Sequence, residues 1–221
     1  DEAYWQRLIA LARALNLLDD LLQPSESARV FLEKPRSGAL SWLVQGWASS
    51  ANLDELRLVP QLRCEGNWQH ASTPPRQTLI DLLSALSVES WYKLDDLVEE
   101  IHQHYPNFLR GSTEFNTWII SSTDPEPQLL YGFEHWSDVE GQFIRFFMTD
   151  ILTDLGLART GTLNEDSDAI LFQLTPWFFT LLIKNQLPEL AEENQPVLVG
   201  RDGKLEMTRL TPRLARYQLS R

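Results

Sequence analysis

The spacing of apolar side chains over residues 138–154 predicts a helix with one continuous buried side. Gly156 follows it directly, at the position where a left-handed residue commonly ends a helix. The predicted buried side chains are Val139, Phe143, Phe146, Phe147, Ile151 and Leu155.

The next pattern predicts two strands and a closing helix. Residues 157–160 and 169–174 are expected to pair around an acidic loop at 164–168. Pro176 suits the first turn of a helix that runs to about residue 185. Helix, paired strands and helix in this order are typical of the second half of a winged-helix domain.

The matching first half precedes this pattern. A leucine-rich helix is predicted over 76–86, a short strand at 90–92 and a second helix over 93–104. Helix 138–154 then takes the recognition position of the fold. We therefore expect one winged-helix domain over residues 76–187.

Residues 1–35 contain an internal echo of that pattern. Leu15-Asn16-Leu17 resemble residues 155–157, and Leu22-Gln23-Pro24 resemble residues 174–176. In both places the second segment is followed by an apolar helix. The echo predicts that residues 1–35 are the C-terminal part of a truncated winged-helix-like module.

Two segments remain. Residues 36–75 are predicted as a helical linker region with a short helix near Asp54. Residues 188–221 are predicted to form a β-hairpin around Asp202-Gly203 and a helix after Pro212, which pack on the main body or open a further domain. The expected fold class is mainly α within α+β, with tandem winged-helix modules, short β-wings and a C-terminal β-hairpin plus helix.

Composition indicates a globular protein. The chain has 221 residues, 43% of them hydrophobic, and its longest apolar run is too short for a membrane span. Its one cysteine, Cys64, excludes an intrachain disulfide, and no signal-peptide pattern is present, so we expect a cytoplasmic protein without membrane contact. The chain begins at Asp1 and a helix follows at once, so we expect a piece of a longer protein.

The sequence holds no constellation that predicts catalysis. A Gly-x-Ser-x-Gly nucleophile elbow and a Gly-x-x-x-x-Gly-Lys phosphate loop are both missing. His102 and His104 point apart on a helix, and Glu100 with His104 supplies only two metal ligands. Cys64 is expected to be an idle thiol. We expect a protein that is not an enzyme and has no cofactor, metal or small-molecule substrate.

Charge argues against nucleic-acid binding by the predicted recognition helix. The whole chain carries −12, and residues 138–154 hold four acids against Arg145. Such an element is repelled by phosphates instead of releasing counterions. We expect its acidic surface to contact protein.

Positive charge is concentrated in residues 197–221, where six cations and two acids leave a net charge of +4. These cations are either nucleic-acid contacts or, as the alternative, surface charges that keep the protein soluble or form ion pairs with acids of residues 1–196. The candidate nucleic-acid contacts are Arg201, Lys204, Arg209, Arg213 and Arg216. Among the tryptophans, Trp68 and Trp118 are the candidates for exposure, and the following are predicted in the core: Trp5, Trp42, Trp91, Trp136 and Trp177.

From about Trp42 onward, the chain resembles the amino-terminal accessory region of xeroderma-pigmentosum-B-type helicases, as found in large bacterial proteins of unassigned role. The short motifs that carry the resemblance are Trp42 with Trp47, Arg76 with the leucine helix, Trp91, Asn107-Phe108-Leu109-Arg110, Gly132-Phe133, Trp136-Ser137-Asp138-Val139-Glu140-Gly141, Leu155-Gly156-Leu157, Phe172-Gln173-Leu174-Thr175 and Arg216-Tyr217-Gln218. The resemblance implies a region that sits beside a helicase-like motor or regulates DNA transactions. Helicase activity is not implied, because the phosphate loop is missing.

Three hypotheses for the function follow. The first is a non-catalytic accessory or interaction module of a helicase-related or DNA-processing protein, whose partner is a protein or adjacent domains of the same longer chain. The second is a DNA-binding winged-helix transcription regulator that uses the basic C-terminal segment. The third is an acidic mimic of nucleic acid that occupies a basic groove on a partner.

Overall fold

The computed structural model describes residues 2–66, 70–111, 115–163 and 169–220, and these form an α+β fold. The α-helices are α1 (Glu2–Ala14), α2 (Glu26–Glu33), α3 (Arg36–Ser49), α4 (Thr73–Ser84), α5 (Leu94–His104), α6 (Gln142–Phe146), α7 (Leu152–Asp154) and α8 (Arg213–Leu219). The 3-10 turns are η1 (Glu55–Leu58) and η2 (Phe133–His135), and the π-helical segments are η3 (Ser137–Gly141), η4 (Phe147–Ile151) and η5 (Phe178–Ile183). The strands are β1 (Leu62–Glu65), β2 (Tyr92–Lys93), β3 (Ile119–Ser122), β4 (Ala158–Thr162), β5 (Ile170–Leu174), β6 (Leu198–Val199) and β7 (Leu205–Glu206).

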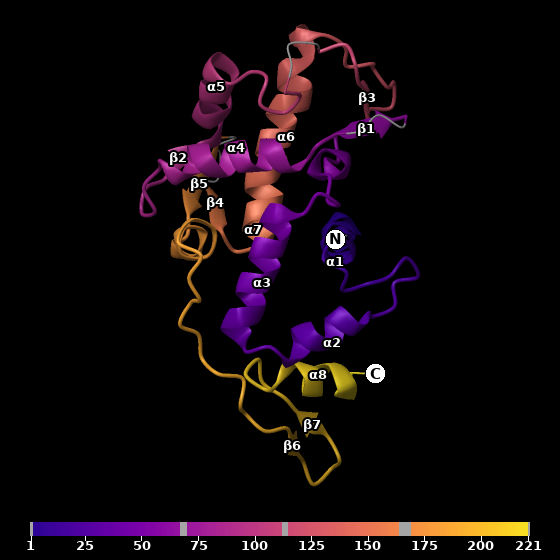
Figure 1. Cartoon of the computed structure of the whole chain (residues 1–221), viewed down its shortest axis with the longest axis vertical. Helices are drawn as coiled ribbons and strands as arrows, with labels where there is room; N and C mark the ends of the chain where they lie inside the picture. Colours follow the sequence, from indigo (N-terminus) through magenta and orange to yellow (C-terminus); the bar gives the residue numbers. More distant parts are fainter. Residues whose placement is uncertain (1, 67–69, 112–114, 164–168, 221) are drawn as a thin grey trace.

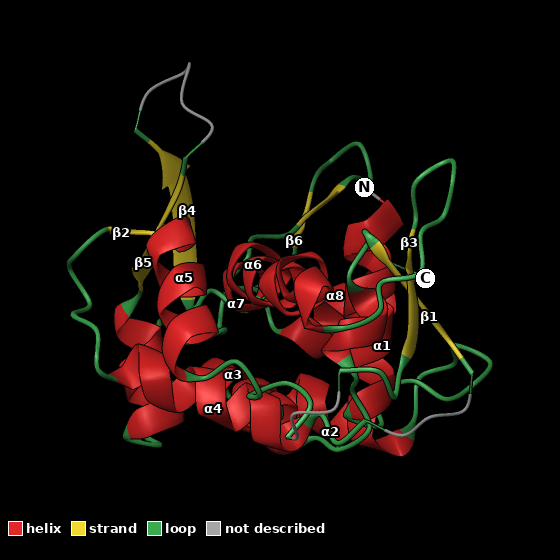
Figure 2. Cartoon of the chain, turned by 90° about the horizontal axis from the view of Figure 1, so that it is seen from above, coloured by secondary structure: helices red, strands yellow, loops and turns green. Residues whose placement is uncertain are grey.

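The segments η3, α6, η4 and α7 follow one another without a break, and together they form the central helix (residues 137–154). Figure 2 shows this helix end-on, with α5 on one side, α3 and α4 below, and α1 on the other side. Five of the six side chains predicted to be buried are buried in this helix, together with Ile144, Met148 and Leu152; the five are Val139, Phe143, Phe146, Phe147 and Ile151. The sixth, Leu155, follows the helix and is only half-buried. A helix that is apolar on most sides belongs in a core, and this one passes through the middle of the upper half of the molecule (Figure 1).

The largest sheet has the strand order β2-β5-β4, all antiparallel. Its strand β2 lies between α4 and α5 in the chain, and the β4–β5 hairpin follows the central helix. Gly156, with a φ of 71°, ends the central helix in the left-handed conformation that the sequence predicted. The predicted order of helices and strands between residues 76 and 187 is confirmed, while the acidic loop at 164–168 lies outside the described residues.

A second sheet joins two segments that are distant in the chain. Strand β1 pairs with β3 in antiparallel register, from Leu62 opposite Ser122 to Glu65 opposite Ile119. The sequence pattern did not predict β1, because this strand is short and its partner lies more than fifty residues away in the chain. In Figure 1 this two-stranded sheet lies to the right of the upper part of the central helix.

The internal echo has matching hydrogen bonds in its two copies. The backbone N–H of Ser25 donates to the carbonyl of Leu17 at 3.0 Å, and that of Thr175 donates to the carbonyl of Leu157 at 2.9 Å. Each hydroxyl also donates to the carbonyl of the left-handed residue just before that leucine, Asn16 or Gly156. The two segments therefore share a local geometry as well as a sequence order.

The alignment of the two copies needs one correction. The sequence pattern paired Pro24 with Pro176, and this pairing is wrong by two residues. Pro24 forms an isolated β-bridge with Leu18, at the place where Leu174 pairs with Ala158. Pro24 therefore corresponds to Leu174, because the hydrogen bonds of the next residue determine the register.

The C-terminal hairpin β6–β7 and helix α8 form close to their predicted positions. The helix α8 lies against α2, where the guanidinium of Arg213 stands 5.2 Å from the ring centre of Phe31 and donates to the carbonyl of Lys34. This end of the chain therefore packs on the body of the molecule (Figure 1). Among the described residues, no helix has the length and apolar character to cross a membrane.

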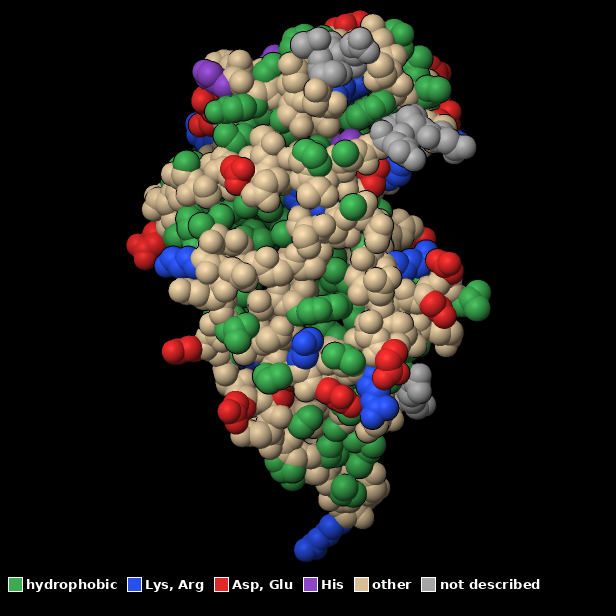
Figure 3. Space-filling model, in the orientation of Figure 1, with side chains coloured by type: hydrophobic (Ala, Val, Ile, Leu, Met, Phe, Trp, Pro, Cys, Tyr) green, Lys and Arg blue, Asp and Glu red, His purple; other side chains and the backbone are tan. Residues whose placement is uncertain are grey.

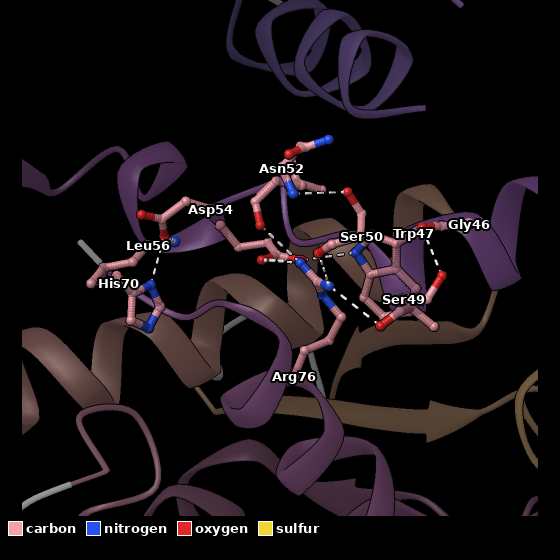
Figure 4. A network of polar contacts seen from close by, with 12 residues as sticks. Gly46, Trp47, Ser49, Ser50, Asn52, Asp54, Leu56, His70 and Arg76 are labelled. Atoms are coloured by element: carbon pink, nitrogen blue, oxygen red, sulfur yellow. Dashed lines mark hydrogen bonds and ion pairs between the residues drawn. The ribbon is translucent and has the colours of Figure 1, made fainter. Parts of the chain in front are cut away.

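A buried ion pair connects α4 to η1. The Nε and Nη2 atoms of Arg76 donate to the two carboxylate oxygens of Glu55 at 2.7 and 2.8 Å. The same guanidinium donates to the carbonyls of Ser50 (2.7 Å) and Leu53 (2.9 Å), and the indole of Trp47 donates to Glu55 (2.9 Å), as Figure 4 shows. Both charges are buried, and this set of contacts compensates for their lost hydration.

Replacing Arg76 tests the importance of this network. The Arg76→Met variant leaves the Glu55 carboxylate unpaired in the core, so its free energy of unfolding should fall by about 3–5 kcal/mol in urea titrations. The control is Arg29→Met, which removes an exposed pair with Glu33 and should leave that free energy nearly unchanged. Equal losses in the two variants would contradict a structural role for the network.

Candidate interaction surfaces

Glu140 of the central helix lies in the core. Its carboxylate accepts a hydrogen bond from Arg110 Nε at 2.5 Å, and both side chains are buried. Arg110 also donates to the carbonyl of Phe115 and stands 4.7 Å from the ring centre of Trp118. Burial raises the pKa of Glu140, because lost hydration outweighs the attraction of Arg110. Counting Glu140 as part of an outward acidic surface was therefore wrong.

Two more acids of the central helix are engaged by α1. Arg7 lies 3.0 Å from Asp150 and 2.7 Å from Asp154, and its side chain is only 11% exposed. Its guanidinium also stands 5.9 Å from the ring centre of Phe146. These contacts hold α1 along the central helix.

The central helix has little open surface. Arg145 pairs with Asp95 of α5 at 2.6 Å. Exposed positions occur only at its two ends, at Ser137, Asp138 and Asp154. The helix assigned to the recognition position is therefore closed along its length by the rest of the chain.

The helix α5 carries a group of exposed acidic side chains. Asp95, Asp96, Glu99 and Glu100 are all exposed, in agreement with the predicted outward side of this helix. The ring of His104 lies 3.2 Å from the Glu100 carboxylate, a single surface pair. This exposed set is called the α5 acidic face below.

The structure divides the five candidate nucleic-acid contacts into two groups. Arg201, Lys204 and Arg209 are exposed, and Lys204 pairs with Asp202 at 3.0 Å. Figure 3 shows positive charge at the tip of the molecule, where the β6–β7 hairpin ends. The other two, Arg213 and Arg216, are half-buried and engaged by a carboxylate of the chain.

That carboxylate belongs to Glu193. Its two oxygens lie 2.8 Å from Arg213 Nε and 3.1 Å from Arg216 Nη2, and its side chain is 9% exposed. From the sequence, ion pairs with acids of the body were an alternative role for these cations, and this role applies to Arg213 and Arg216. The Nε atom of Arg216 is buried and donates to no acceptor.

A cavity of about 420 Å³ opens beside these residues. Four of its lining residues are arginines, and one of them, Arg36 at the start of α3, was missed by the sequence analysis because it lies some 170 residues from the others. The remaining lining is mostly apolar. We call this cavity the arginine pocket; it is lined by Arg36, Arg209, Arg213, Arg216 and Glu193 together with Phe31, Ala39, Leu40, Leu43, Trp177 and Leu190.

The tryptophans differ in part from their prediction. Trp118 is buried under Arg110, and Trp68 lies outside the described residues. Trp5 and Trp91, which were predicted in the core, are 61% and 48% exposed, so that prediction was wrong. Periodicity gave the direction of these side chains on their own segments, but the described residues leave about half or more of each side chain uncovered.

The described residues contain no group of three or more His, Cys, Asp and Glu side chains arranged to hold a metal ion. The thiol of Cys64 is half-buried, with Sγ 3.9 Å from the carbonyl of Leu56. Burial raises the pKa of Cys64 to about 11. A thiol in this state is a poor nucleophile, because the reactive species is the thiolate.

Comparisons with protein-family models, curated proteins and solved structures find no match for this chain.

Cys64 provides a first prediction for this region. With its pKa near 11, the folded protein should react with iodoacetamide at pH 8 roughly a hundred-fold more slowly than the urea-unfolded chain, whose thiol has a pKa of about 8.5. Mass spectrometry of timed samples measures both rates. Similar rates in the two states would show that the thiol is open to solvent.

Glu140 provides a prediction about pH. A carboxyl group whose pKa is raised by folding stabilises the folded state below its unfolded pKa and loses that contribution as pH rises through the folded value. The free energy of unfolding of the wild type, relative to Glu140→Gln, should therefore decrease as pH rises above about 4.3. Urea titrations from pH 4 upward measure this difference, and a constant or increasing difference would contradict the raised pKa.

Proposed function

We propose that this chain is a non-catalytic interaction module of a helicase-related or DNA-processing protein, and that it binds mainly protein. In this proposal residues 76–187 are a winged-helix domain, and residues 1–35 are part of a second, tandem module. The order of elements and the β2-β5-β4 sheet support the first assignment. The hydrogen bonds shared by Ser25 and Thr175 support the second.

The closure of the central helix is the observation that carries this proposal. A winged helix that reads DNA inserts its recognition helix into the major groove, which requires one open side of that helix. Here Arg7 holds α1 against Asp150 and Asp154, and the remaining sides pack in the core. A module built this way retains the winged-helix framework without an open reading helix.

The α5 acidic face is the part of the proposed domain that is free to meet a partner. Its four acids carry negative charge on a short, exposed stretch of helix. Such a surface favours a protein partner with a complementary basic patch, and it disfavours a phosphate backbone. A cytoplasmic location is part of the same proposal.

A second candidate function, a DNA-binding transcription regulator, is favoured by the exposed cations of the C-terminal segment. Arg201 and Arg209 have no ion-pair partner within the part of the chain that the structure describes. Cations on a projecting hairpin are suited to contact phosphates without help from the central helix.

Fluorescence anisotropy with a labelled duplex of mixed sequence distinguishes the two functions. The interaction module should show no saturable binding at low salt. The transcription regulator should instead bind the duplex, with an affinity that falls steeply as salt rises. In that case Arg201→Gln/Arg209→Gln should reduce the magnitude of the slope of log K against log salt by about 2. The matched control Arg29→Gln/Arg63→Gln removes the same charge from other exposed sites and should leave that slope unchanged.

A further inference from the structure

We propose that the arginine pocket binds an acidic peptide segment that carries a large apolar side chain. This site is separate from the α5 acidic face and takes a ligand of the opposite charge. It lies between α2 and α3 on one side and α8 on the other, at the lower end of the molecule in Figure 1.

Unbalanced positive charge is the first argument. Four arginines line the pocket, and the single acid among its lining residues is Glu193. Glu193 engages Arg213 and Arg216, while Arg36 and Arg209 have no ion-pair or hydrogen-bond partner among the described residues. A guanidinium binds a carboxylate through two parallel hydrogen bonds, so two such sites remain open.

The apolar wall is the second argument. Phe31, Leu40, Leu43 and Trp177 line the same cavity, and its volume of about 420 Å³ accommodates at least one large side chain. Burying apolar area there contributes about 25 cal/mol per Å² to binding. A ligand that combines a carboxylate with an apolar side chain matches both parts of the lining.

The chain itself shows how such a segment fits. Leu190 and Glu193 belong to an extended stretch before β6, and both line the pocket. Leu190 lies with the apolar wall, while the Glu193 carboxylate binds two arginines. One buried donor beside these contacts, Arg216 Nε, has no acceptor among the described residues.

The surroundings favour a short peptide over a nucleic acid. The adjoining cavity shares Arg36, Arg213 and Glu193 with the arginine pocket. It adds one cation, Lys34, and three acids, Glu33, Glu189 and Glu192, so negative charge lies directly beside the arginines. A nucleic acid carries phosphates along its whole length, and the acids beside the pocket and the net charge of −12 repel them. A peptide can place its acidic and apolar side chains only where the pocket accepts them.

The test uses the full chain and three fluorescein-labelled peptides, with anisotropy as the measurement. The first peptide contains glutamates around a Leu-Phe pair, the second has glutamines in place of the glutamates, and the third has alanines in place of Leu-Phe. The first should bind, and each of the other two should bind at least about ten-fold more weakly, because each lacks one class of contact.

Paired variants locate the binding. The double variant Arg36→Gln/Arg209→Gln should bind the first peptide about ten-fold or more weakly than the wild type, because it lacks the two open guanidinium sites. Arg201→Gln/Lys204→Gln removes the same charge from the exposed hairpin and should change affinity less than about two-fold. Thermal unfolding by circular dichroism checks that both variants keep the wild-type midpoint, as expected for side chains with no buried internal contact.

Three results would overturn this inference. The first is that the first peptide shows no saturable binding. The second is that both double variants lose the same amount of affinity for it. The third is that a single-stranded oligonucleotide of the same charge binds more tightly than the peptide, and that this binding is lost in Arg36→Gln/Arg209→Gln. The last result would assign the pocket to nucleic acid. The function proposed above is tested separately, by the binding of duplex DNA. If the peptide does not bind, that proposal is unaffected.

Discussion

The enclosure of the central helix is the constraint on which the other features of this molecule depend. Apolar side chains leave it in nearly every direction, so α1, α3, α5 and the strands must surround it to remove that area from water. Two arginines from distant segments complete the enclosure. Arg7 reaches Asp150 and Asp154 from α1, and Arg110 reaches Glu140 from the connection after α5. Three of the acids that make this helix negatively charged, Glu140, Asp150 and Asp154, therefore bind the neighbouring segments through ion pairs.

The two buried ion pairs differ in how completely they are satisfied. Arg76 and Glu55 use nearly all of their hydrogen-bonding capacity within one network (Figure 4). Glu140 has one carboxylate oxygen without a partner, in agreement with its raised pKa. A buried pair costs hydration, so it adds modestly to stability, whereas the loss of one partner is costly. Both pairs therefore specify which segments meet in the core.

The surface separates charges of opposite sign. The α5 acidic face lies at one end of the molecule, and the arginine pocket lies at the other, beside α8 (Figure 1). Under the two proposals above, the α5 acidic face would contact a basic partner and the arginine pocket would bind an acidic segment. Charge of each sign steers its own partner and repels the other, so specificity is built into the distribution.

The sequence by itself determined the elements whose causes are local. Apolar spacing identified the central helix and α5, Gly156 marked the helix end, and Asp202-Gly203 marked the β6–β7 turn, because each depends on neighbours within one or two turns of chain. It also indicated where positive charge gathers.

Only the tertiary structure decided which of these side chains are available. It placed Glu140 in the core, left Trp5 and Trp91 exposed, joined β1 to β3, and brought Arg36 to Arg209. Periodicity gives the direction of a side chain on its own element. Burial and pairing depend on what another part of the chain brings to that side, and this follows from packing between segments far apart in sequence.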